Sequence, residues 1–370
     1  MRLRTLFRTS PRTSLRTPLR TSLRTSLRTS PRTSRTSPRA TAAALVLALA
    51  GTAFTAAPAS AAPAPTGITY EVTRNAAAYV DVPGTEITFD ALAGERSFLW
   101  SRYFSTGPVD TLAAGDNIGN TFAIRCRVAD GTPDGAPLPA GTEAGAYWAA
   151  NLVPPGETSL TAALRWVFTA PADGAYSCRL SVVSYSSIIA NGRTVTMRVP
   201  AGAELARKTY PATARWTLLA GTGTTVARAT TATTLGYTYT PSAADTDLVL
   251  YQDAALSTCA AGSPICSGGT SAYTGSTVET WVEAQPRNAD GTLCGPALTG
   301  PVSRWNISNA KHHQTAANTL RLTRAQLGGC AQVRTTLKVR NVAGNPVNIH
   351  DGYASGTIAA THGAGISYTA

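Results

Sequence analysis

Short runs of β-branched and aromatic residues, each followed by a turn, recur along the chain from residue 68 onward. Because successive side chains of a strand point to opposite faces, such alternating runs predict half-buried strands. No amphipathic pattern of ten or more residues predicts an α-helix, although residues 201–208 and 325–327 could each hold a single turn. The sequence therefore predicts an all-β protein. The clearest expected strands cover residues 68–73, 86–90, 98–104, 121–128, 162–169, 176–183 and 194–199.

Turn dipeptides separate these strands, and their residues tolerate a positive φ angle. They are Asp130-Gly131, Asp173-Gly174, Asn191-Gly192 and Asp290-Gly291. The Asn191-Gly192 pair predicts a hairpin between residues 185–190 and 194–199. Many short strands with such turns are typical of antiparallel β-sandwiches.

The chain is longer than one core usually supports. It has 370 residues, and single hydrophobic cores stop growing near ~250–300 residues. We therefore expect two tandem β-sandwich domains, at residues 67–205 and 206–370, with the boundary in the AGAELARKTYP segment. The tetrapeptide ADGT occurs at 129–132 and again at 289–292, an echo that fits an internal duplication.

The N-terminal region has the layout of a secretory signal. Residues 40–61 form a short apolar run that ends in Ala59-Ser60-Ala61, a small-x-small cleavage site. We expect cleavage before Ala62, with residues 62–66 as a Pro/Ala linker. Residues 1–39 are a low-complexity Arg/Thr/Ser tract, interpreted as an overlong n-region or a start placed upstream of the true one. The alternative is a basic arm for nucleic acid or membranes.

The net charge of +12 comes almost entirely from this tract, which holds eleven arginines. The rest of the chain has 21 basic and 20 acidic residues, which gives no support for nucleic-acid binding. No Arg-Arg pair occurs in the tract, which favours the general secretion route over the twin-arginine route. No apolar run approaches the roughly 20 residues that span a bilayer. We expect a secreted, extracellular protein without a membrane span once the signal is removed.

Six cysteines in an exported chain predict disulfides, because the extracellular environment is oxidising. Fifteen pairings are formally open, and keeping each pair within one expected domain reduces them. The prediction is Cys126–Cys178, Cys259–Cys266 and Cys294–Cys330. A metal site is the alternative, but no C-x₂-C spacing occurs and the four histidines are not at ligand spacings.

The DGAYSC segment at residues 173–178 resembles the D-x-G-x-Y-x-C corner of immunoglobulin-like domains, shortened by one residue. The 52-residue spacing of Cys126 and Cys178 also suits that family. The resemblance implies that Tyr176 bonds back to the corner, and it extends to secreted bacterial β-sandwich proteins as an architecture. Trp148 lies later than the usual core tryptophan, and Trp166 sits on the preceding strand instead. No function is implied.

The sequence contains no recognisable catalytic or metal-binding motif. No G-x-S-x-G occurs, His350-Asp351 are neighbours that a strand would point apart, and His312-His313 lie in a polar stretch expected to be an exposed loop. Asp245 with Asp247, and Asp130 with Asp134, lack the remaining ligands of a calcium loop. No glycine-rich phosphate loop occurs. We therefore predict no catalytic residues, no cofactor and no metal.

Two aromatic segments are candidate ligand sites. Glu279, Trp281 and Glu283 alternate in TVETWVEAQ and form a candidate ligand platform for a sugar. On a strand the two acids are about 13 Å apart, too far for a glycosidase pair. In the FLWSRYF run, Phe98, Trp100, Arg102 and Phe104 are expected on one face, packed in the first core with Arg102 at its rim.

These expectations combine into a secreted, non-catalytic protein that binds an extracellular ligand or associates with the cell envelope. The ligand is unknown, and a cell-wall or extracellular glycan is the candidate partner. The alternative is a secreted carbohydrate-active enzyme or other hydrolase whose site is built from loops. A purely structural surface protein is a third class.

Overall fold

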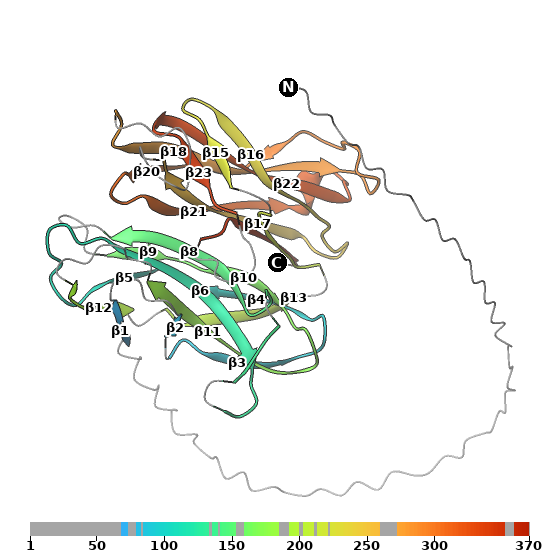
Figure 1. The fold of residues 1–370 in the computed structure, drawn as a ribbon. Coiled ribbons are helices and arrows are strands. Elements are labelled where there is room, and N and C mark those ends of the chain that lie inside the picture. Colours follow the sequence, from blue (N-terminus) through green and yellow to red (C-terminus); the bar gives the residue numbers. More distant parts are fainter. Residues whose placement is uncertain are drawn as a thin grey trace, which may run out of the picture. The chain divides into compact units, whose positions relative to one another are not determined.

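The structure is a computed structural model (Figure 1). It describes residues 68–72, 79–82, 84–132, 135–139, 141–152, 159–184, 192–199, 203–210, 213–220, 223–259, 272–351 and 359–369. All of these belong to one compact unit, Ser60–Ala370. The expected signal peptide and its cleavage site lie outside the described residues. Within the described part no α-helix occurs, so the chain is all-β, as predicted.

The N-terminal half packs two small sheets against part of a large one. The first small sheet has the order β1-β12-β5-β9, made of Ile68–Val72, Val195–Val199, Phe104–Pro108 and Leu160–Ala162. The second has the order β10-β4-β13, made of Arg165–Thr169, Arg96–Ser101 and Leu205–Tyr210. Facing them are β6 (Ile118–Val128), β8 (Ala144–Leu152), β11 (Gly174–Ser184), β2 (Val80–Asp81), β3 (Ile87–Ala91) and β7 (Ala136–Pro137).

Large aromatic side chains fill the space between these layers. Phe104 of β5 meets Phe122 of β6 edge to face at 5.4 Å between ring centroids. Phe168 of β10 contacts Tyr176 of β11 in the same manner at 5.1 Å. Edge-to-face pairs of this kind add to the stabilisation from burial.

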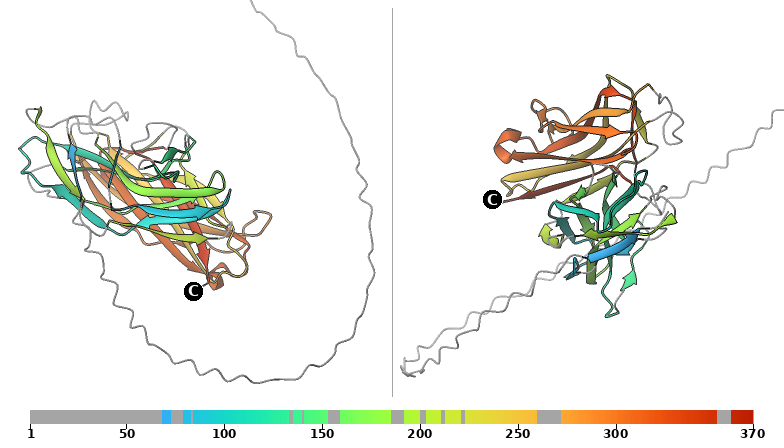
Figure 2. Two further views of the ribbon diagram at one scale, coloured as in Figure 1. Left: turned by 90° about the horizontal axis from the view of Figure 1, so that it is seen from below. Right: turned by 90° about the vertical axis from the view of Figure 1, so that its left-hand side faces the viewer.

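The C-terminal half has its own pair of layers (Figure 2). One is a five-stranded sheet of β16 (Thr231–Tyr239), β22 (Gln332–Gly344), β18 (Gly275–Arg287), β19 (Leu298–Thr299) and β20 (Ser303–Ser308). The other contains β14 (Arg215–Leu218), β24 (His362–Tyr368), β17 (Asp247–Thr258), β21 (His313–Thr323), β15 (Thr224–Val226) and β23 (Val347–Ile349). Buried aliphatic side chains such as Leu256, Val278 and Leu337 lie between them.

One twelve-stranded sheet carries strands from both halves. Its β21 and β8 are joined at Gln314 and Ala150, and the Thr315 hydroxyl bonds the Ala149 backbone. The expected division at residue 205 falls at the start of β13, which pairs with β4. The division into two domains therefore stays a prediction.

Strand positions agree well with expectation except where a strand breaks. Residues 98–104 form two strands, because β4 ends at Ser101 and β5 begins at Phe104. Residues 162–169 are broken in the same way, between β9 and β10. The helical turn expected within 201–208 is wrong, since residues 205–210 form β13, whereas Arg324–Leu327 does form a short 3₁₀ turn. The first strand of the expected hairpin, residues 185–190, lies outside the described residues.

The repeated ADGT segments form the same turn. In each, the aspartate carboxylate accepts from the backbone N–H and the hydroxyl of the threonine two residues on, Asp130 from Thr132 and Asp290 from Thr292. These bonds lower the pKa of both aspartates. Gly131 and Gly291 have φ angles of 83° and 87°, which glycine adopts without strain. The same local chemistry accounts for the echo without a duplication.

The cysteines are oxidised as predicted wherever the structure describes both partners. Cys126–Cys178 and Cys294–Cys330 are disulfides. Cys259 is also disulfide-bonded, but its predicted partner Cys266 lies outside the described residues. Loops of 52 and 36 residues correspond to about 4 kcal/mol of stabilisation each in the chain-entropy picture.

The resemblance to the immunoglobulin-like corner is confirmed at Tyr176 and stops there. Its hydroxyl donates to the Ala172 carbonyl and accepts from the Ala172 N–H at 3.2 Å. However, Cys126 and Cys178 face each other on neighbouring strands of one sheet. The immunoglobulin disulfide joins two sheets. The described topology therefore supports a β-sandwich and gives no support for an immunoglobulin-like one.

Candidate functional site

A cavity of about 650 Å³ lies between two facing sheets, and we call it the inter-sheet pocket. One wall is the outer face of β10-β4-β13, and the other is the outer face of β24-β17-β21. Its aromatic lining residues are Phe98, Trp100, Tyr103, Tyr251 and Tyr368. Its cationic lining residues are Arg102, Arg165, Lys208 and Arg321. None of the described lining residues is acidic.

Three of the lining rings form a stack. Phe98 lies between Trp100, at 5.3 Å and 23°, and Tyr251, at 5.5 Å and 9°. The Arg165 guanidinium lies 4.4 Å from the centre of the Tyr251 ring, a cation–π distance. Burial raises the pKa of the Tyr251 hydroxyl. The expected burial of FLWSRYF in the first core is therefore wrong for Phe98 and Trp100.

The strand break explains that difference. If residues 98–104 were one strand, alternation would place Phe98 and Phe104 on the same face. Because the chain leaves the strand at Arg102 and Tyr103, Phe104 enters the first core while Phe98 packs against Val249 and Ile366 of the second half. Arg102 and Tyr103 lie exposed beside the pocket, and Tyr103 is 68% exposed.

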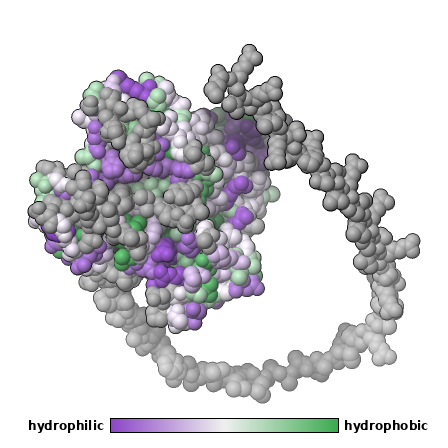
Figure 3. Space-filling model, viewed as in Figure 1, coloured by the Kyte–Doolittle hydropathy of each residue, from purple (hydrophilic) through white to green (hydrophobic). Residues whose placement is uncertain are grey.

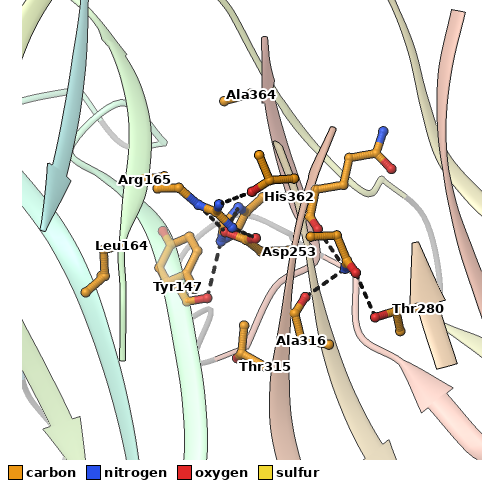
Figure 4. A network of polar contacts seen from close by, with 12 residues as sticks. Tyr147, Leu164, Arg165, Asp253, Thr280, Thr315, Ala316, His362 and Ala364 are labelled. Atoms are coloured by element: carbon orange, nitrogen blue, oxygen red, sulfur yellow. Dashed lines mark hydrogen bonds and ion pairs between the residues drawn. The ribbon is translucent and has the colours of Figure 1, made fainter. Parts of the chain in front are cut away.

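A buried polar network holds Arg165 in place (Figure 4). Asp253 of β17, 1% exposed, accepts from both Nε, at 3.3 Å, and Nη2 of Arg165. The Thr319 hydroxyl accepts from Nη1 at 2.8 Å. His362 lies directly opposite Asp253 on β24, with Nδ1 3.9 Å from the carboxylate. The guanidinium is therefore fixed by partners from two strands of the opposite sheet.

His362 is neutral in this network. Burial lowers its pKa, against the opposite influence of Asp253. Its Nε2 lies 3.3 Å from the Tyr147 carbonyl, and because a carbonyl can only accept, Nε2 carries the hydrogen. The Trp216 ring covers His362 at 4.8 Å. Since Asp253 and His362 are both buried, neither is presented to a ligand in the pocket.

The expected platform residues share one face of β18, as the alternation predicts. Glu279 accepts from Arg340 Nε at 2.9 Å and lies 3.5 Å from Arg304 Nη1. Glu283 lies 3.3 Å from Lys338 Nζ, and Lys338 is the residue opposite Trp281 on β22. Both carboxylates are therefore already ion-paired within the sheet.

Three histidines gather where the sequence predicted an exposed loop. His313 opens β21 and is 6% exposed, and its ring lies 4.3 Å from that of His312 and 5.2 Å from that of His350. Burial lowers the pKa of all three, to about 4 for His350. His350 Nε2 lies 2.9 Å from the Ser257 hydroxyl, but Ser257 is only 1% exposed. This pair is therefore closed to a substrate.

Metal binding finds no site in the part of the chain that the structure describes. No group of three or more His, Cys, Asp or Glu side chains is arranged there to hold an ion. Asp245 instead accepts from the Ser367 hydroxyl, and Asp247 from Thr246. Asp134 lies outside the described residues. Likewise, none of the described elements is a helix long and apolar enough to cross a bilayer.

The sequence did not single out Arg165, Asp253 or His362. One signal was present, because Asp253 interrupts the apolar strand DLVLYQDAAL, and a buried acid requires a partner. The identity of that partner depends on tertiary pairing, since Arg165 is 88 residues away in the chain.

Comparisons with known proteins assign no family. No protein-family model matches the chain, and no curated protein matches it. Solved structures that resemble it include the particle of infectious bursal disease virus, at 11% identity and a TM-score of 0.24, covering 82% of this chain and 72% of that one. The structure of broad bean stain virus has 13% identity and a TM-score of 0.26, covering 83% of this chain and 89% of that one. A candidate secreted protein from Parabacteroides distasonis has 8% and 0.18, covering 81% and 88%. These scores carry no argument about function.

Proposed function

We propose that this chain is an exported, non-catalytic binding protein whose ligand occupies the inter-sheet pocket. The observation that carries the proposal is the lining of this cavity of about 650 Å³ by aromatic and cationic side chains from both halves of the chain. Mostly apolar pockets with a few convergent polar groups are typical small-molecule sites. The extracellular part of the proposal rests on the signal-like residues 40–61.

Binding is favoured over hydrolysis by the state of the titratable groups. A catalytic acid, base or nucleophile must reach the substrate. Asp253, His362 and Ser257 are each at most 3% exposed, and each has a partner inside the protein. Hydrolysis remains the alternative that the experiment has to exclude.

The platform around Trp281 is the second candidate surface. Its aromatic ring on an outer face favours stacking on a cell-wall or other extracellular glycan. Its acids weigh against it, because Arg340 and Lys338 already use part of the accepting capacity of Glu279 and Glu283 and neutralise their charge. We therefore rank it below the inter-sheet pocket.

The test measures binding of the full-length protein to insoluble cell-wall material and to purified extracellular polysaccharides. Trp100→Ala and Trp281→Ala form a matched pair, since each removes one partly exposed indole from one candidate surface. We expect Trp100→Ala to weaken binding at least tenfold and Trp281→Ala to leave it unchanged. Loss only in Trp281→Ala would move the site to the platform, and release of soluble sugar fragments would establish an enzyme.

A further inference from the structure

The charge of the inter-sheet pocket restricts its ligand. Among its described lining residues four are cationic and none is acidic. Asp253 beneath the wall neutralises Arg165. Lys208 lies over the Tyr368 ring at 5.5 Å. Arg102 and Arg321 are exposed, and neither has a carboxylate within ion-pair distance among the described residues. A pocket with this balance attracts anions and repels cations.

The aromatic stack restricts the ligand further. Trp100 is the outer member of the Trp100–Phe98–Tyr251 stack and is partly exposed. A flat ring, or the apolar face of a sugar ring, gains contact area on such a surface without ordering flexible side chains. The cavity of about 650 Å³ suits a ligand of two or three rings.

Preorganisation separates the inner cation from the outer ones. Arg165 is held by Asp253 and Thr319 before any ligand arrives, so its position costs no ordering on binding. Arg102, in the break between β4 and β5, and Arg321, opposite Val249 in the β17–β21 pair, come from different halves of the chain. An anion between them would be contacted from both walls of the pocket.

We propose that the ligand of the inter-sheet pocket is a ring-bearing organic carboxylate, with its ring on Trp100 and its carboxylate bound by Arg102 and Arg321. This inference rests on the proposed function and names the ligand class of the same site. An acidic saccharide and an aromatic acid share this chemistry.

Two pairs of probes separate ring from charge. Trigalacturonate and its methyl ester share the sugar rings, and 1-naphthoate and 1-naphthamide share the aromatic ring. Titration calorimetry on the full-length protein should show one of the acids binding at least tenfold more tightly than its neutral partner. Raising the salt concentration should weaken binding of the acid and leave binding of the neutral compound unchanged, because exposed charges are screened. The acid that binds identifies the source of the ligand.

Variants then locate the binding. Arg321→Ala and Arg102→Ala should each weaken binding of the acid several-fold without affecting binding of its neutral partner. Trp100→Ala should weaken binding of both compounds. Arg228→Ala, an exposed cation paired with Tyr273 outside the pocket, is the matched control and should have no effect. Arg102, Arg321 and Arg228 are all exposed, so these variants should melt at the wild-type temperature.

Two results would overturn the inference, and they differ in what they leave standing. Equal binding of acid and neutral partner, lost in Trp100→Ala, would remove the carboxylate and keep the pocket as the binding site. Failure of all four probes would remove this ligand class, while the cell-wall experiment would decide the proposed function independently.

Discussion

The inter-sheet pocket and the β18 platform both combine aromatic rings with charged side chains, yet they treat charge in opposite ways. On β18 the acids Glu279 and Glu283 lie beside Arg340 and Lys338 on the neighbouring strand, so the surface is neutralised by its own pairs. In the pocket four of the described lining residues are cationic and none is acidic, and the buried Asp253 pairs with Arg165. A surface whose charges are paired with one another needs no ligand, whereas a surface with an excess of positive charge is stabilised by an anionic one. The face of the molecule in Figure 3 mixes hydrophilic and hydrophobic residues without one dominant apolar area among the described residues.

The largest expected effect is on the buried ion pair. Asp253→Ala leaves the Arg165 guanidinium without its carboxylate in a site where both side chains are at most 13% exposed. Breaking a buried pair in this way costs about 3–5 kcal/mol of folding free energy. Urea unfolding measures the loss. The matched platform variant, Arg340→Ala, should cost less than about 1 kcal/mol, because Arg340 is exposed. Equal losses would refute the contrast between the two regions.

Removal of the central ring comes next. Phe98→Ala deletes the middle member of the Trp100–Phe98–Tyr251 stack, and Phe98 is 5% exposed. Truncation of a buried phenylalanine typically costs about 3–5 kcal/mol. Thermal unfolding and pocket binding should both suffer, while Trp281→Ala should cost less because its ring is partly exposed. A greater loss of stability in Trp281→Ala would show that the platform indole is the more important of the two.

Acidification should destabilise one sheet of the C-terminal half before the other. All four histidines lie in or beside the twelve-stranded sheet, and burial lowers their pKa, to about 4 for His350. The unfolded chain therefore binds more protons than the folded one between pH 6.5 and about 4, so stability falls as pH falls through this window, by about 3 kcal/mol from His350 alone. Hydrogen exchange should show β17 and β21 losing protection before β18 and β22. Uniform loss across both sheets would argue against this assignment.

The smallest expected effect is the coupling between Glu279 and Arg340. A double-mutant cycle at this pair, in which Arg340 is 52% and Glu279 12% exposed, should give less than about 1 kcal/mol and should shrink in high salt. The equivalent cycle at Arg165 and Asp253 should give more than about 2 kcal/mol and resist salt, since buried pairs are screened less. A salt-insensitive coupling on β18 would mean that the platform charges are more desolvated than their exposure indicates.

Local chemistry was readable from the sequence. The tyrosine bond at Tyr176 and the ADGT turns depend on residues that are near in the chain, and their patterns were sufficient. The two cysteine pairs, 52 and 36 residues apart, followed from an even number of cysteines kept within the expected domains. The platform alternation on β18 followed from period two alone.

The pocket was not readable, for two physical reasons. A break of two residues after Ser101 separates Phe98 and Phe104, which a continuous strand would place on the same face. No residue propensity in the sequence marks that break. The network at Arg165 also requires β10 to meet β17, whose pairing with β24 brings Asp253 opposite His362 across 109 residues of chain. Long-range pairing of this kind depends on the packing of the whole structure. Its one sign in the sequence is Asp253, a charged residue within an apolar run.

Strand β17 contributes to two parts of the molecule, because its side chains alternate between its two faces. Leu248 and Leu250 lie in the core of the C-terminal half, whereas Val249, Tyr251 and Asp253 lie on the face toward the pocket. A change in its register or twist would therefore alter the ligand wall and the interior at once. Evolutionary drift in ligand preference is expected instead at Arg102 and Tyr103, which lie outside any strand and can be exchanged without disturbing the scaffold.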